Sequence, residues 1–254
     1  MDSPPNKVCV ITGAAHGIGA ATARLMSLHG GMNMVLSDQD KEAADELKNH
    51  LNTIRPQSCI ALATDVSDPK RVSQLMKAAV DRFDRLDILI NNAGIWPKKV
   101  ARTADTDIND WEQVIGVNQS GVYYGMKYAI PYMLEQGGGL IVNVASLAGL
   151  KASPNHISYA ASKYAVVGMT KTAALEYGKK NIRINAVCPG YTDSQYMNQL
   201  HATRPEIKSR LLKATPLSRY AKIDEVADAI YWLCSDQASF ITGQTLTIDG
   251  GIGL

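Results

Sequence analysis

Residues 7–19 have the sequence KVCVITGAAHGIG, a short apolar run that passes into a glycine-rich loop. The run Lys7–Thr12 is rich in β-branched residues, which predicts a buried strand. Gly13, Gly17 and Gly19 follow it, and the segment Gly17–His29 has the pattern of a helix. Main-chain N–H groups at a helix start favour a pyrophosphate, and glycines let the chain approach it closely. Because the spacing is G-x-x-x-G-x-G, a plain tight turn is the alternative interpretation.

Outward from this loop, short apolar runs alternate with longer amphipathic segments almost to the last residue, without a linker or a repeat. The runs that predict strands are Lys7–Thr12, Met32–Ser37, Ser58–Thr64, Leu86–Ile90, Gly139–Ala145, Asn181–Val187 and Gln244–Ile248. The segments that predict helices are Gly17–His29, Gln39–Leu51, Pro69–Phe83, Ile108–Gln136, Ser158–Lys179 and Ile223–Ser235. We therefore expect one α/β domain over residues 1–254, with a Rossmann-like, doubly wound, seven-stranded parallel sheet flanked by helices on both faces.

An acidic residue, Asp38, stands at the end of the second predicted strand, nineteen positions after Gly19. A carboxylate about 20 positions beyond a glycine loop accepts hydrogen bonds from the adenosine ribose of a dinucleotide. Its charge would also repel the 2′-phosphate of NADP, and positions 37–40 contain no Arg or Lys. The sequence thus favours NAD over NADP. His16 lies in the loop near the expected ribose, and a neutral imidazole there would not attract a phosphate at pH 7.

Four residues are candidates for catalysis, namely Asn118, Ser146, Tyr159 and Lys163. Tyr159 and Lys163 are four residues apart on a predicted helix, so their side chains emerge on the same face. A nearby ammonium favours the phenolate and lowers the pKa of a tyrosine by ~1–3 units, which makes it usable as a general acid or base. Ser146 follows a predicted strand at the sheet edge where open α/β folds bind ligands. Singly, each pattern is also typical of an exposed helix face or a helix cap.

A series of motifs in a fixed order extends over nearly the whole chain. In sequence order they are TGAAHGIG at 12–19, Asp65-Val66, NNAG at 91–94, Val117-Asn118, Ser146, YAASK at 159–163, Pro189-Gly190, TGQ at 242–244 and DGG at 249–251. Taken together, they resemble the short-chain dehydrogenase/reductases of the classical type. The resemblance implies a hydride transfer between a carbinol carbon and nicotinamide.

The resemblance also implies where the cofactor would bind. It assigns the pyrophosphate region to Gly13, Gly17, Ile18 and Gly19. It assigns the adenosine ribose to Asp38, the adenine to Asp65 and Val66, and the cofactor ribose side to Asn92, Ala93 and Gly94. After the Pro189-Gly190 motif, it assigns the carboxamide to the main chain of Thr192, which departs from the usual aliphatic residue, and the diphosphate side to the Ser194 hydroxyl.

Catalytic roles follow from the same resemblance. Tyr159 would exchange a proton with the substrate oxygen, and Ser146 would hold and polarise that oxygen. Lys163 would bind the nicotinamide ribose and lower the pKa of Tyr159. Asn118 would kink its helix and keep a water that links Lys163 to bulk solvent.

Segments that vary within this family form the substrate pocket, so Trp96, His156, Tyr191 and Tyr196 join Ser146 as candidate substrate residues. Residues 191–218 form an irregular insertion of the kind that often serves as a lid. We expect a small-molecule secondary alcohol or ketone as substrate. The first alternative is an NADPH-dependent reductase of 3-oxoacyl thioesters on an acyl carrier, and the second is a non-catalytic cofactor-sensing protein on the same fold.

Composition excludes other classes of partner. The chain has 26 Lys+Arg against 24 Asp+Glu, a net charge of +2, and no apolar stretch of membrane-spanning length, so we expect neither nucleic-acid nor membrane binding. The four cysteines are widely spaced, which predicts reduced thiols, a cytoplasmic location and no metal site. The helix Ser158–Lys179 is apolar on two sides, which predicts contact with a second subunit, and the family resemblance implies a homotetramer.

Overall fold

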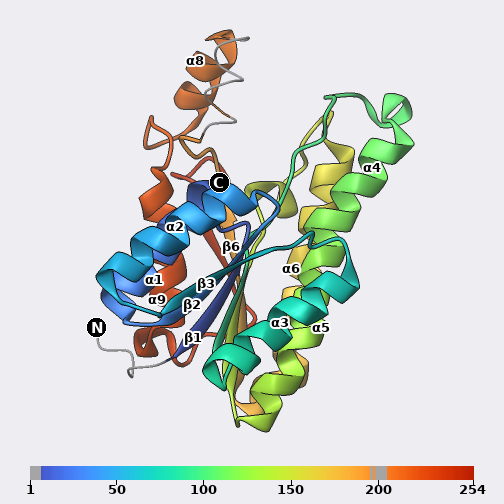
Figure 1. Ribbon diagram of the computed structural model, residues 1–254. Coiled ribbons are helices and arrows are strands. Elements are labelled where there is room, and N and C mark those ends of the chain that lie inside the picture. Colours follow the sequence, from blue (N-terminus) through green and yellow to red (C-terminus); the bar gives the residue numbers. More distant parts are fainter. Residues whose placement is uncertain (1–6, 195–196, 198–204) are drawn as a thin grey trace.

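The computed structural model describes residues 7–194, 197 and 205–254. Its sheet has seven strands in the order β3-β2-β1-β4-β5-β6-β7, and every neighbouring pair is parallel. The strands are β1 (Val8–Thr12), β2 (Asn33–Asp38), β3 (Cys59–Ala63), β4 (Ile88–Asn91), β5 (Gly139–Val144), β6 (Ile182–Pro189) and β7 (Thr245–Ile248). Figure 1 shows the sheet between two groups of helices. This confirms the predicted doubly wound parallel sheet, and every strand end lies within two residues of its predicted position.

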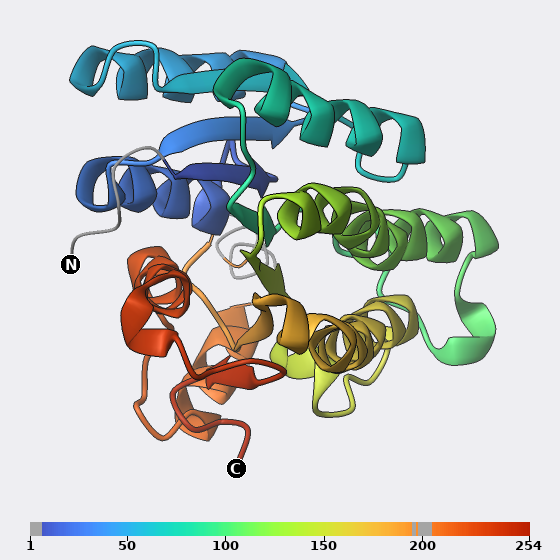
Figure 2. The same cartoon turned by 90° about the horizontal axis from the view of Figure 1, so that it is seen from below.

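Helices cover both faces of the sheet. The longer ones are α1 (Gly17–Gly30), α2 (Lys41–Ile54), α3 (Pro69–Phe83), α4 (Ile108–Ile115), α5 (Gly121–Glu135), α6 (Ile157–Tyr177), α8 (Pro205–Ala214) and α9 (Ile223–Cys234). In Figure 2, α1, α2 and α9 lie on one side of the sheet and α3, α5 and α6 on the other. Within β1, Val8 and Val10 pack in the core under α3 and α5, whereas Cys9 and Ile11 pack under α1 and α9. Burial of alternate residues on both faces explains why the strands are continuous apolar runs.

Local residues determine where several helices begin. Asp40 caps α2 by accepting a hydrogen bond from the Ala43 N–H, and Asp68 caps α3, whose first residue is Pro69. The helix α1 differs, because no side chain caps its first turn. The N–H groups at that end therefore remain available to a ligand.

The predicted helix Ile108–Gln136 is divided in the structure. A π-helical turn over Gly116–Ser120 separates α4 from α5, and Asn118 lies within it. The resemblance implied a kink at Asn118, and this turn places the irregularity there. Single π turns inside α-helices are frequent at functional sites.

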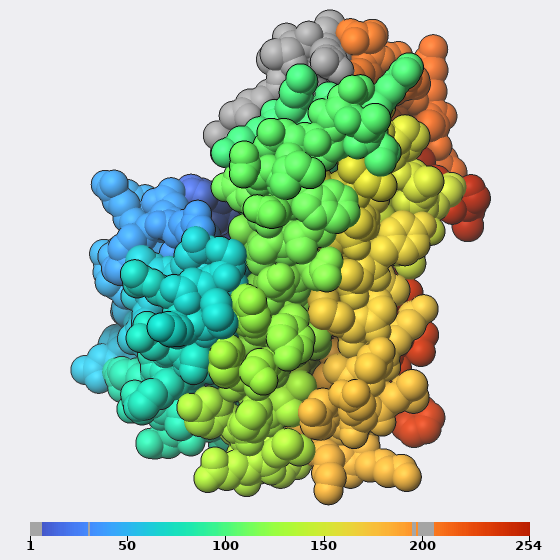
Figure 3. All heavy atoms as spheres, turned by 90° about the vertical axis from the view of Figure 1, so that its right-hand side faces the viewer, coloured from blue at the N-terminus to red at the C-terminus, as the bar shows by residue number. Residues whose placement is uncertain are grey.

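The layer of α3 to α6 presents a continuous outer face (Figure 3). Within α6, Leu175 and Tyr164 are 87% and 47% exposed, although the same helix buries Val166 and Val167 against the core. The helix is therefore apolar on two sides, as its sequence indicates. Contact of the exposed side with further subunits stays a prediction.

Part of the predicted lid, residues 191–218, can be described. Thr192 forms a parallel bridge with Ala221, which ties the segment after β6 to the start of α9. Further on, the same insertion contains the helix α8. Tyr196 lies outside the described residues. No helix in the described part of the chain is long and apolar enough to span a bilayer.

Candidate active site

The glycine loop lies beside the end of β4, at the point where strand order reverses around β1. Asn92 joins the two, because its Nδ2 donates to the carbonyl oxygens of Thr12 (3.0 Å) and Gly13 (2.8 Å). The hydroxyl of Thr12 accepts hydrogen bonds from the N–H groups of Asn92 and Ala93, both at 3.1 Å. Sequence reasoning missed this role of Thr12, although a threonine that ends a buried strand was visible in the sequence.

Close packing explains two of the glycines. A Cβ on Gly13, whose φ is +64°, would lie 2.8 Å from the Ala93 Cα, and a Cβ on Gly19 would overlap the Gly13 carbonyl oxygen. Gly17 has a φ of +53°, and a Cβ there would meet nothing within 4 Å. The loop is therefore held from behind by Asn92 and Ala93, while Gly17 faces open space at the start of α1. Such an exposed helix start with available N–H groups suits an anion.

Asp38 stands at the end of β2 with both carboxylate oxygens in use. Oδ2 accepts from the Ala15 N–H at 2.9 Å and Oδ1 from the Asp40 N–H at 3.1 Å. A carboxylate has about four lone-pair sites, so each oxygen retains capacity for a further donor. These bonds fix the carboxylate beside the glycine loop.

His16 is paired with an acid that the sequence analysis did not single out. Its Nε2 lies 2.9 Å from Asp40 Oδ2, and both side chains are exposed. The hydrogen bond with His16 lowers the pKa of Asp40. The His16 imidazole is thus engaged with a carboxylate on the same edge of the sheet as Asp38.

The residues predicted for the adenine lie after β3. Asp65 Oδ1 accepts hydrogen bonds from the N–H and the hydroxyl of Ser67, at 2.9 and 2.7 Å. Val66 is buried, and its side chain packs against Gly121 at the start of α5. These contacts fix the loop after β3, and its contact with adenine stays a prediction.

Lys163 is fully enclosed beneath the end of β5. It is 3% exposed, and its Nζ donates to the Val144 carbonyl oxygen at 2.8 Å. The Nζ also lies 5.7 Å from the centroid of the Tyr159 ring. Burial lowers the pKa of Lys163 to about 8. At that separation a positive charge on Lys163 stabilises a phenolate on Tyr159.

Asn118 connects α6 to the segment after β4. Its Nδ2 donates to the Ile95 carbonyl oxygen at 2.9 Å, and its Oδ1 accepts from the Ile95 N–H at 2.8 Å. The same Nδ2 reaches Ser162 Oγ at 3.3 Å, and Ser162 donates to the Tyr159 carbonyl oxygen at 2.7 Å. The side chain of Asn118 is completely buried. Ser162 was not a candidate, because its part depends on this contact across 44 residues of sequence.

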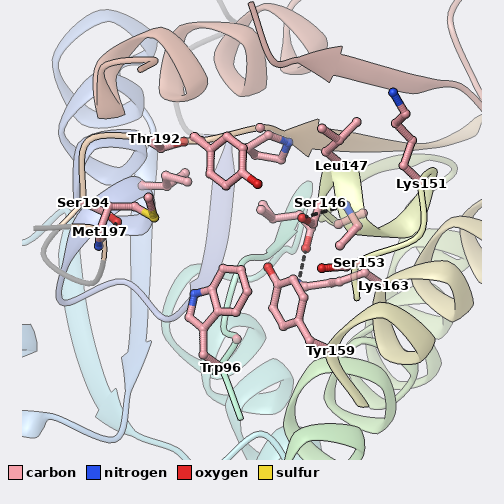
Figure 4. A pocket seen from close by; sticks show the side chains of 18 of the residues that line it. Trp96, Ser146, Leu147, Lys151, Ser153, Tyr159, Lys163, Thr192, Ser194 and Met197 are labelled. Atoms are coloured by element: carbon pink, nitrogen blue, oxygen red, sulfur yellow. Dashed lines mark hydrogen bonds between the residues drawn. The ribbon is translucent and has the colours of Figure 1, made fainter. Parts of the chain in front are cut away.

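A cavity of about 420 Å³ opens where these segments meet. Its lining comprises Ile18, Asn92, Gly94, Ile95, Trp96, Val144, Ala145, Ser146, Leu147, Ala148, Lys151, Ala152, Ser153, Tyr159, Lys163, Pro189, Gly190, Tyr191, Thr192, Ser194, Met197 and Ile252. In Figure 4, the side chains of Ser146, Tyr159 and Lys163 lie together on one side of the cavity, with Trp96 beside Tyr159. Ser146 Oγ accepts from the Ala148 N–H at 3.1 Å. Three of the four catalytic candidates thus line one cavity, and Asn118 lies behind it.

The wall after β6 brings two motifs together. A Cβ on Gly190 would lie 2.7 Å from Asp249 Cβ, so the Pro189-Gly190 and DGG motifs are neighbours in space. The Thr192 hydroxyl is buried and has no hydrogen-bond partner among the residues that the structure describes, and Ser194 Oγ accepts from the Met197 N–H at 3.4 Å. An orphaned buried hydroxyl on a cavity wall suits a polar ligand group.

The predicted substrate residues differ in their positions. Trp96 and Tyr191 line the cavity, and burial raises the pKa of Tyr191. His156 does not line it, because its ring packs edge-on against Trp96, with centroids 5.8 Å apart. Sequence reasoning missed the lining residues Lys151 and Ile252, whose positions depend on how the chain end folds back.

Comparisons with known proteins identify the family of this chain. A family profile described as enoyl-(acyl carrier protein) reductase matches residues 13–253. The chain belongs to the short-chain dehydrogenase/reductase family. It is therefore an oxidoreductase with a nucleotide-binding Rossmann fold. Groups of side chains able to hold a metal ion are absent from the residues that the structure describes.

Three relatives of this dehydrogenase/reductase are informative. The 3-oxoacyl-(acyl-carrier-protein) reductase of Thermotoga maritima is 39% identical, over 97% of each chain. The cyclohexanol dehydrogenase of Acinetobacter sp. is 38% identical, over 96% of this chain and 94% of that protein. The crystal structure of the 3-ketoacyl-(acyl-carrier-protein) reductase from Brucella melitensis, complexed with NADH, superposes with a TM-score of 0.89 at 32% identity, over 98% of each chain.

The lowered pKa of Lys163 predicts a pH-dependent stability. Above about pH 8 the folded chain releases the Lys163 proton, whereas the unfolded chain keeps it up to about 10.5. The unfolded state then binds more protons, so the free energy of unfolding rises with pH in this window by up to about 1.4 kcal/mol per pH unit. Urea unfolding of wild type and Lys163→Met at pH 7, 8, 9 and 10 isolates this contribution. We expect wild type to gain stability relative to the variant above pH 8, and parallel pH profiles would contradict it.

Proposed function

We propose that this short-chain dehydrogenase/reductase is an NAD-dependent enzyme that transfers hydride between a small secondary alcohol or ketone and the nicotinamide, with Tyr159 as general acid/base. The observation that carries the proposal is the grouping of Ser146, Tyr159 and Lys163 on one wall of a cavity that also reaches the glycine loop at Ile18. That grouping supports the proposal, because a proton donor, a polarising hydroxyl and a cation on one wall suit a carbinol oxygen.

The residues present fit a nicotinamide dinucleotide. The uncapped start of α1 and the open space at Gly17 suit the pyrophosphate. The carboxylate of Asp38 retains acceptor capacity for ribose hydroxyls, and the orphaned Thr192 hydroxyl suits the carboxamide side. We assign the remaining contacts to the loop residues named by the family motifs. When bound, the cofactor supplies the hydride acceptor or donor.

The chain's own residues then handle the proton. In the oxidative direction, Tyr159 accepts the proton of the substrate hydroxyl, and Ser146 holds the same oxygen by a hydrogen bond. Lys163, charged and fixed by Val144, stabilises the phenolate and contributes donors to the ribose. Asn118 keeps the π turn and the Ile95 segment in place behind Lys163. Reduction uses the same groups in reverse, with Tyr159 as the acid.

A second candidate function is reduction of a 3-oxoacyl thioester on an acyl carrier. It is favoured by the similarity to the Thermotoga maritima reductase, while the similarity to the cyclohexanol dehydrogenase favours a small alcohol. Because a related ketoacyl reductase was crystallised with NADH, the cofactor alone does not separate the two functions. Initial rates with cyclohexanol, 2-hexanol and an acetoacetyl thioester separate them. Faster turnover of the thioester would overturn the small-alcohol proposal.

The charge of Asp38 predicts the cofactor preference. We expect wild type to turn over faster with NAD than with NADP, because the 2′-phosphate would lie against a fixed carboxylate. Asp38→Asn keeps an oxygen acceptor but removes the charge, so the NADP:NAD ratio of kcat/KM should rise by about tenfold or more. Asp40→Asn, which removes a neighbouring exposed charge, is the matched control and should change the ratio less. A wild type that prefers NADP, or an unchanged ratio in Asp38→Asn, contradicts the assignment.

A further inference from the structure

Trp96 makes an unusually direct contact with the proposed acid/base. Its indole stacks on the Tyr159 ring with centroids 4.0 Å apart and planes inclined by 10°. The imidazole of His156 also meets the indole, with the two ring planes inclined by 75°. Trp96 belongs to none of the motifs that carry the family resemblance, so the resemblance gives this contact no role.

The stack restricts how the Tyr159 ring turns. Tyr159 is 8% exposed, and Trp96 covers one face of its ring while Lys163 lies 5.7 Å from the ring centroid. Rotation of the phenol out of this position would separate the two aromatic faces. In Figure 4 the Tyr159 hydroxyl points into the cavity on the side of Ser146. The indole therefore keeps the Tyr159 hydroxyl at the position where it would contact the substrate oxygen.

Trp96 is also part of the cavity wall. Apolar members of the same lining are Leu147, Ala148, Met197 and Ile252. Together with the indole, these side chains offer flat aromatic and aliphatic surface to an apolar group of a substrate.

We infer that Trp96 is a positioning and specificity-determining residue, which fixes the Tyr159 hydroxyl and selects compact secondary alcohols that carry an apolar ring. This inference rests on the proposed function. On binding against an indole, a saturated ring loses less conformational freedom than a flexible chain of the same size. The cavity of about 420 Å³ must also admit the nicotinamide ring, so the remaining space is suited to a small molecule.

The test compares Trp96→Ala and Trp96→Phe with wild type, using cyclohexanol and 2-hexanol at saturating NAD. In Trp96→Ala we expect kcat to fall about tenfold for both alcohols, because the phenol is no longer held, and KM to rise for cyclohexanol alone. Trp96→Phe preserves an aromatic face and should recover most of kcat. Trp111→Ala, which removes a tryptophan outside the cavity lining, should leave both constants unchanged.

Two further measurements separate the possible failures. Calorimetric titration with NADH should give the same affinity for wild type and Trp96→Ala, because the indole acts on the substrate side. If wild type oxidises cyclohexanol, Tyr159→Phe does not, and Trp96→Ala matches wild type, the inference is overturned and the proposed function stands. A Trp96→Phe variant as impaired as Trp96→Ala, or an equal KM change for both alcohols, also overturns it. If wild type oxidises neither alcohol, the proposed function fails and the inference fails with it.

Discussion

Replacement of Tyr159 by Phe is expected to lower kcat by roughly 10²–10⁴, the range that a positioned general acid or base contributes. The substitution removes one oxygen and keeps the ring, so the stack with Trp96 and the packing of α6 remain. The proton of the substrate hydroxyl then has no acceptor at the wall formed by Ser146 and Lys163. Single-turnover rates of NADH formation, followed by absorbance with cyclohexanol in excess, measure the loss directly.

Two controls make this result specific to Tyr159. Tyr164→Phe removes the same atom from a 47% exposed tyrosine of the same helix and should retain the wild-type rate. The NADH affinity of Tyr159→Phe should stay within a fewfold of wild type. Undiminished turnover in Tyr159→Phe would refute the proposed mechanism. A wild type that binds NADH but turns over no alcohol, ketone or thioester would support the non-catalytic alternative.

The arrangement of the sheet follows closely from sequence, because the inner strands β2, β1, β4, β5 and β6 are buried on both faces. Runs such as Lys7–Thr12 and Gly139–Ala145 lack the alternation of a half-exposed strand, and helices between them force parallel pairing. Most helix starts were predicted equally well, since α1, α3, α4 and α9 begin at the expected residues. The second helix was expected from Gln39 but begins at Lys41, because Asp40 serves as its cap.

Contacts within a local motif could be predicted from the sequence, whereas contacts between distant segments could not. Tyr159 and Lys163 are one helical turn apart, so their proximity can be read from spacing. Trp96 meets Tyr159, and His16 meets Asp40, only after the strands are assembled. The same reason hid the pairing of Asn118 with Ile95, since no local pattern predicts which main chain a buried amide will reach.

Lys163 is the second residue whose loss is expected to have a large effect. It lies inside the protein, where burial lowers its pKa to about 8, so at pH 7 most molecules still hold the ammonium beside Tyr159. Lys163→Met fills similar space without charge. We expect kcat to fall by about 10²–10³, because the phenolate loses its counter-charge, and NAD to bind more weakly, because ribose donors are lost.

The comparison with Lys171→Met shows whether this loss is local. Lys171 is an exposed lysine of the same helix, so its replacement changes net charge equally but leaves the cavity intact. Steady-state kinetics and calorimetric NAD titration on both variants, at pH 7, give the two effects separately. Equal activity in the two variants would show that a cation beside Tyr159 is not needed. A loss of NAD affinity with kcat retained would restrict Lys163 to cofactor binding. We expect Lys163→Met alone to lose both kcat and NAD affinity. The buried Lys163 ammonium lies 5.7 Å from the centroid of the Tyr159 ring and lines the cavity that would receive the ribose.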